Sequence, residues 1–95
     1  MIEIMKFRLA PFVREDDFLR ADRALQEGFA YQQPGLMRRT TARDDEGSWI
    51  VIDVWRSDAD ADECAARWDA DPIAQRFMAL LDDSTTSTAR YAQLD

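Results

Sequence analysis

The sequence predicts an α+β fold in which a four-stranded antiparallel sheet carries helices on one face, in the chain order βαββαβ. Three observations lead to this prediction. Two-residue alternation or a strand-favouring composition marks residues 2–9, 36–43, 49–56 and 84–94. Spacings of three and four between apolar residues mark two helical segments, 15–33 and 57–82. Turn and capping residues separate these segments, and the 95 residues fit a single domain, 1–95.

The first strand has two distinct faces. Along residues 2–9, Met5, Phe7 and Leu9 share one face, and Ile2, Ile4, Lys6 and Arg8 share the other. Pro11 ends the strand. The helix that follows, residues 15–33, begins with three carboxylates that suit the positive end of the helix dipole. The stretch "QQPG", residues 32–35, ends it, because the residue before a proline is pushed out of helical geometry.

A hairpin is expected next. Residues 36–43 and 49–56 flank the stretch "DDEG", in which Gly47 supplies the positive φ that the turn needs. Two registers are compatible with this sequence. A four-residue loop places Arg38 opposite Asp53, whereas a three-residue loop with a glycine bulge places Arg39 there.

The second helical segment, residues 57–82, divides in two. Ser57 is a good N-cap for the first piece, with Asp60 three residues later. Asp71 followed by Pro72 starts the second piece, since proline is favoured at the first helical position. Residues 84–94 then form the last strand, with residues 89–94 as its firmest part.

This element order is the ferredoxin-like arrangement, whose helices cover only one face of the sheet. If the first and third strands pair, five aliphatic side chains gather on the uncovered face: Ile2, Ile4, Ile50, Ile52 and Val54. A patch of this kind is a liability on a monomer. We therefore expect a second copy of the sheet to cover it, as a homodimer built like a dimeric α/β barrel.

Composition excludes several classes of function. The net charge of −7 argues against a nucleic-acid partner and against an anionic membrane surface. Charges interleave with the apolar residues of the N-terminus, unlike a signal peptide, so a cytoplasmic location is expected. The chain has one cysteine and no histidine, so neither an internal disulfide nor a bound metal is expected.

Residues 32–82 resemble the antibiotic biosynthesis monooxygenase (ABM-like) family. The resemblance is carried by Pro34-Gly35 opening the second strand, by Val54-Trp55-Arg56-Ser57 ending the third, and by Asp71-Pro72 before the closing "FMALL". It implies a homodimer that acts as a cofactor-independent monooxygenase on a small quinol-like or polyketide-like aromatic compound. The alternative is a non-catalytic dimer that binds or senses a small molecule in the same cleft.

One branch of this family degrades haem, and its site is missing here. Those proteins use an asparagine on the first strand and a histidine ligand on the second helix. The corresponding places hold Phe7, and Phe77 or its neighbour Arg76. We therefore expect no haem and no other cofactor.

The candidate site centres on the third strand, where Trp49, Asp53 and Trp55 share a face. Trp55 is either the wall of an aromatic-binding pocket or a core residue, and Trp49 is expected in the core. Asp53 is either paired with Arg38 or Arg39, or a general base whose pKa an apolar wall raises. Trp55 and Asp53 are thus the catalytic candidates. The substrate-binding candidates are Phe7, Arg38, Arg39, Trp68, Phe77 and Arg90. Of these, Trp68 and Phe77 are either core residues or part of the cleft lining.

Overall fold

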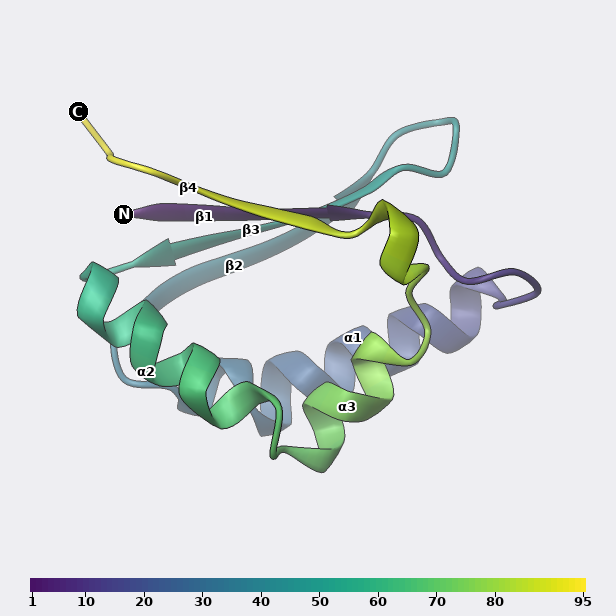
Figure 1. Cartoon of the computed structure of the whole chain (residues 1–95), viewed down its shortest axis with the longest axis horizontal. Coiled ribbons are helices and arrows are strands. Elements are labelled where there is room, and N and C mark those ends of the chain that lie inside the picture. The colour runs from purple at the N-terminus through teal and green to yellow at the C-terminus, as the bar shows by residue number, and fades with distance from the viewer.

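The computed structural model describes residues 1–95 and has the predicted element order. The strands are β1 (Ile2–Phe7), β2 (Leu36–Arg43), β3 (Trp49–Trp55) and β4 (Ser87–Tyr91). The helices are α1 (Glu15–Gly28), α2 (Asp58–Trp68) and α3 (Pro72–Met78), with short 3-10 turns at Ala30–Gln32 and Asp83–Thr85. The sheet is antiparallel with the order β2-β3-β1-β4. All three helices lie on one side of it, which confirms the ferredoxin-like prediction (Figure 1).

Three predicted elements are shorter than expected. The first helix ends at Gly28 and continues as a 3-10 turn, and Gly28 packs so closely on α3 that an added Cβ would lie 2.7 Å from Ile73 Cδ1. The first strand ends at Phe7, and Leu9 forms only an isolated bridge to Leu81. The last strand covers residues 87–91. The prediction that residues 89–94 form its firmest part is therefore wrong beyond Tyr91. Tyr91 pairs with Ile2, the first residue of β1, and nothing remains for later residues to pair with.

The hairpin adopts the second of the two expected registers. Arg39 lies opposite Asp53, and the Asp44 amide bonds to the Ser48 carbonyl at 2.9 Å, which leaves a three-residue loop. Gly47 has φ +84°, as the turn requires. The predicted caps are also present: Ser57 accepts from the Asp60 amide at 3.1 Å, and Asp71 accepts from the Ile73 amide at 2.8 Å.

The two faces of the sheet differ in what covers them. On the helix side, nine buried residues form the core: Phe7, Phe18, Leu25, Phe29, Trp49, Val51, Ala74, Phe77 and Leu81. On the other side Ile2 pairs with Val54 and Ile4 with Ile52, as expected, and these four side chains are only half-buried. No element of the chain covers that outer face (Figure 1). None of the helices combines the length and apolar character needed to cross a bilayer.

Candidate functional site

A cavity of about 240 Å³ lies between the sheet and the helices. Eleven of its sixteen lining residues are hydrophobic. β1 and β3 supply one wall through Met5, Val51 and Trp55, and α2 supplies the opposite wall through Cys64 and Trp68. The small residues Ala61 and Ala65 share that face of α2 with Cys64, and their short side chains leave the space open.

Asp53 is a carboxylate in this apolar wall. Strand alternation points it toward the helices, and its side chain is 22% exposed. It accepts no hydrogen bond from the protein, and its Oδ1 is shielded from solvent. Burial raises the pKa of Asp53 to about 6, against the attraction of the Arg39 guanidinium. Its carboxyl group therefore changes its protonation state near neutral pH.

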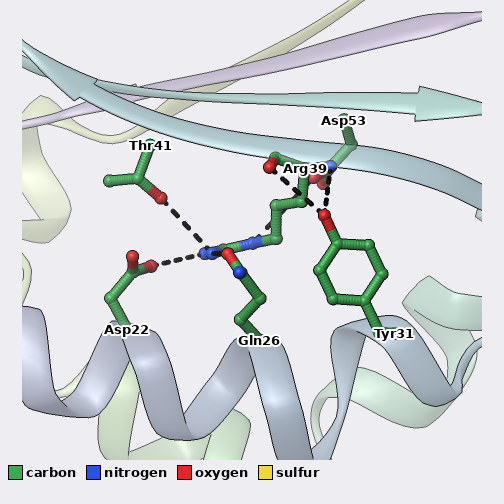
Figure 2. A network of polar contacts seen from close by, with 6 residues as sticks. All are labelled: Asp22, Gln26, Tyr31, Arg39, Thr41 and Asp53. Carbon is green, nitrogen blue, oxygen red and sulfur yellow. Dashed lines mark hydrogen bonds and ion pairs between the residues drawn. The ribbon is translucent and has the colours of Figure 1, made fainter.

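Arg39 faces the cavity but bonds mainly to the first helix. Its Nη2 lies 2.7 Å from Asp22 Oδ1, and its Nη1 donates to Gln26 and Thr41, each at 3.3 Å. Figure 2 shows Asp22 and Gln26 rising from α1 to meet this guanidinium. The nearest approach to Asp53 is 3.9 Å, from Arg39 Nε to Oδ1. The expected pairing partner of Asp53 is thus adjacent, but its close ion pair is with Asp22.

The three tryptophans divide between core and cavity. Trp49 is a core residue, as expected, with its ring 4.7 Å from that of Phe18. Trp55 lines the cavity, is 3% exposed, and its buried indole N–H has no hydrogen-bond partner. Trp68 lines the cavity from α2 and meets Phe29 edge to face, with 5.5 Å between ring centroids.

Solved structures with the same architecture are known. SnoaB, a cofactor-independent oxygenase from Streptomyces nogalater, matches with a TM-score of 0.78 and 22% identity, over 99% of this chain and 93% of SnoaB. A putative antibiotic biosynthesis monooxygenase from Nitrosomonas europaea matches with a TM-score of 0.74 and 15% identity, over 99% and 98%. Another antibiotic biosynthesis monooxygenase matches at 0.76 and 17% over the whole of both chains. The chain has the antibiotic biosynthesis monooxygenase fold.

Sequence comparison adds nothing to this assignment. No protein-family profile and no curated protein matches the chain. The structural likeness therefore establishes the fold, and any activity has to be argued from the residues of the cavity.

Four candidate residues lie outside the cavity. Phe7 and Phe77 belong to the core, where their rings meet edge to face at 6.1 Å. Arg38 is exposed beside Val54 on the outer face, because the observed register points Arg39 inward instead. Arg90 is on the helix side of β4 but is held at the edge by Glu3 at 2.9 Å and Asp62 at 2.6 Å. The expectation that these four line the cleft is corrected accordingly.

The cavity also contains residues that sequence reasoning did not select. Glu3 lies opposite Asp53 in the β1–β3 ladder and lines the cavity. Alternation along β1 could have placed Glu3 on the helix side of the sheet. Cys64 lines the cavity from α2, and burial raises the pKa of its thiol to about 11. The Cys64 thiol is therefore protonated at neutral pH and supplies volume and polarisability, without a reactive thiolate.

Proposed function

We propose that this chain is a cofactor-independent monooxygenase that oxidises a small electron-rich aromatic compound in the cavity beside Trp55. The observation that carries the proposal is Asp53, a carboxylate in an apolar wall that accepts no hydrogen bond and has a pKa near 6. The only other carboxylate lining the cavity, Glu3, is already paired with Arg90. The fold shared with SnoaB, itself a cofactor-independent oxygenase, supports the same reading.

Asp53 has the properties of a general base. A base works best when its pKa is close to the operating pH, and such groups accelerate proton transfer by about 10²- to 10⁴-fold. Trp55 and Trp68 offer flat apolar surfaces that hold an aromatic ring beside the carboxylate. The chain's own contribution is thus to bind, to orient and to move protons.

The reaction can be written for 1-naphthol, which has two fused rings. Asp53 accepts the hydroxyl proton, and the naphtholate transfers one electron to dioxygen. The resulting radical pair combines at ring carbon 4, and protonated Asp53 returns its proton to the peroxide. Loss of the carbon-bound hydrogen together with hydroxide breaks the O–O bond and gives 1,4-naphthoquinone and water. One oxygen atom enters the product, and the substrate supplies all four electrons.

The test follows oxygen uptake and naphthoquinone absorbance with 1-naphthol as substrate. We expect Asp53→Asn to lower the enzyme-dependent rate about 10²-fold or more, because the proton acceptor is removed. The rate of the unaltered protein should fall as the pH drops through about 6, where Asp53 takes up its proton. Glu3→Gln is the matched control, since it removes the other carboxylate of the cavity and should keep most of the rate. Equal rates in the unaltered and Asp53→Asn proteins would exclude Asp53 as the base.

A protein that binds 1-naphthol without consuming oxygen would support the other candidate, a non-catalytic binding or sensing protein. The yield of labelled quinone from labelled dioxygen, measured with and without protein, makes the distinction. A monooxygenase raises this yield above that of the protein-free sample, whereas a binding protein leaves only the yield of spontaneous oxidation.

We also propose that the working form is a homodimer joined through the outer faces of two sheets. Ile2, Ile4, Ile50, Ile52 and Val54 support this proposal, since all five are apolar and half-buried on a face without helices. Contiguous apolar patches of this kind mark association surfaces. The helix-side cavity lies on the opposite face, so pairing leaves it accessible.

A further inference from the structure

Two polar groups in the wall of the cavity have no hydrogen-bond partner in the protein, and both belong to β3. Asp53 accepts no hydrogen bond, and the indole Nε1 of Trp55 donates none. Trp55 is 3% exposed, and its indole N–H is shielded from solvent. A buried polar group without a partner is destabilising, and most native structures avoid it.

The two groups are complementary and adjacent. Residues i and i+2 of a strand point to the same face, with their Cα atoms about 7 Å apart. Asp53 offers an acceptor, and Trp55 offers a donor that can only donate. The other charged groups of the cavity are engaged, Glu3 with Arg90 at 2.9 Å and Arg39 with Asp22 at 2.7 Å. Asp53 and Trp55 are therefore the residues whose polar groups are available to form hydrogen bonds with a ligand.

We propose that the cavity selects a flat compound of two fused rings with a hydroxyl at one end and a second oxygen at the other. The hydroxyl donates to Asp53, and the second oxygen accepts from the Trp55 indole N–H. This inference rests on the proposed function in taking the cavity as the substrate site. It goes further in naming the two residues that determine specificity and the groups they recognise.

The size of the cavity suits two fused rings. An apolar cavity of about 150 Å³ accommodates a single benzene ring. The cavity here is about 240 Å³, which gives room for a second fused ring. Its walls are mostly apolar, as a planar hydrocarbon skeleton requires.

The indole N–H is covered in the empty cavity, so a wall side chain must move before a ligand oxygen reaches it. Met5 and Met78 line the same space. Methionine is unbranched and adapts its shape readily, so these side chains can make room. A ligand oxygen that reaches the indole N–H then gives a hydrogen bond to a group that lacks one.

The test uses three redox-stable compounds with one ring skeleton. 6-Hydroxy-1-tetralone has both oxygens, 1-tetralone lacks the hydroxyl, and 5,6,7,8-tetrahydro-2-naphthol (tetrahydro-2-naphthol below) lacks the carbonyl. Their Kd values are measured by isothermal titration calorimetry on the unaltered protein, Asp53→Leu and Trp55→Phe. Glu3→Gln is the control, because it removes a polar group from the same cavity and leaves the side chains of Asp53 and Trp55 unchanged.

We expect loss of either oxygen to weaken binding to the unaltered protein about 10- to 100-fold. Asp53→Leu should abolish the discrimination between 6-hydroxy-1-tetralone and 1-tetralone, and Trp55→Phe should abolish that between 6-hydroxy-1-tetralone and tetrahydro-2-naphthol. The control variant Glu3→Gln should keep both preferences. Equal affinity for all three compounds, discrimination that survives both variants, or no binding of 6-hydroxy-1-tetralone would each overturn the inference. The three compounds are not oxidised, so their affinities can be measured whether or not the protein turns over 1-naphthol. A failure of the proposed function is thus distinguished from a failure of this inference.

Discussion

At the scale of single residues, burial of the Asp53 carboxylate reduces the stability of the fold at neutral pH. Desolvation dominates its energetics, and the cation at 3.9 Å only partly offsets it. A carboxylate with a raised folded-state pKa binds its proton more tightly in the folded than in the unfolded chain. It therefore favours folding at low pH and opposes folding once both states are ionised.

This linkage gives a prediction for Asp53→Asn. The folded pKa is about 6 and the ordinary value is 3.8. The favourable contribution is complete below pH 3.8 and is lost as pH rises through about 6. At pH 7 we expect the Asn variant to be more stable by up to about 3 kcal/mol, since one pKa unit corresponds to about 1.4 kcal/mol.

Urea unfolding followed by circular dichroism at pH 4 and pH 7 measures this difference. The stability gap between the two proteins should widen with pH as Asp53 ionises. A stability gap of the same size at both pH values would mean that burial does not raise the pKa of Asp53 in the folded protein.

At the scale of elements, Arg39 links β2 to α1. Its ion pair with Asp22 is almost fully buried, with side chains 3% and 11% exposed, and Gln26 and Thr41 complete its hydrogen bonds. The Tyr31 hydroxyl accepts from the Arg39 amide at 3.0 Å, which joins the turn after α1 to the same residue (Figure 2). This network fixes α1 over the sheet, together with the turn after it, where Phe29 and Ala30 line the cavity.

Removing one partner of this buried pair should be worse than removing both. We expect Arg39→Met to destabilise the fold by about 3–5 kcal/mol, because Asp22 is left buried without its cation. The double variant Arg39→Met, Asp22→Leu should recover much of that loss, since apolar residues of similar size fill the space. Chemical denaturation of the three proteins measures the effect.

The chain offers a matched control for this experiment. Arg43 and Glu15 also join β2 to α1, at 2.8 Å, but their side chains are 39% and 48% exposed. Arg43→Met should therefore change stability by no more than about 1 kcal/mol. A double variant at Arg39 and Asp22 no more stable than Arg39→Met alone would contradict the account of the buried pair.

Sequence periodicity predicted the elements and the faces of β3, because alternation is a local property of the strand. It placed Asp53 and Trp55 on one face of the strand, and the family resemblance implied that this face looks toward the helices. It could not assign Arg39 to Asp22, since that contact depends on how α1 is rotated above the sheet. For the same reason Phe7 and Phe77 were assigned to the cleft, although helix packing encloses them in the core.

At the scale of the whole molecule, the sheet has one covered and one open face. The helices bury the core on one side, and the five aliphatic residues of the outer face remain half-buried (Figure 1). A chain of 95 residues has a small core, so burying this patch against a second copy adds stability that the single chain lacks. Stable interfaces of obligate dimers bury on the order of 2,000 Å² or more.

Val54→Asp tests this assembly. We expect light scattering to give twice the mass of the chain for the unaltered protein at micromolar concentration, and the variant to run as a monomer or to aggregate. The introduced carboxylate would lie within the apolar contact, where an unpaired charge is strongly unfavourable. Ala66→Asp adds the same charge to an exposed position on α2 and should remain dimeric. An unaltered protein that runs as a stable monomer would contradict the proposal that the apolar outer faces of two chains pack together.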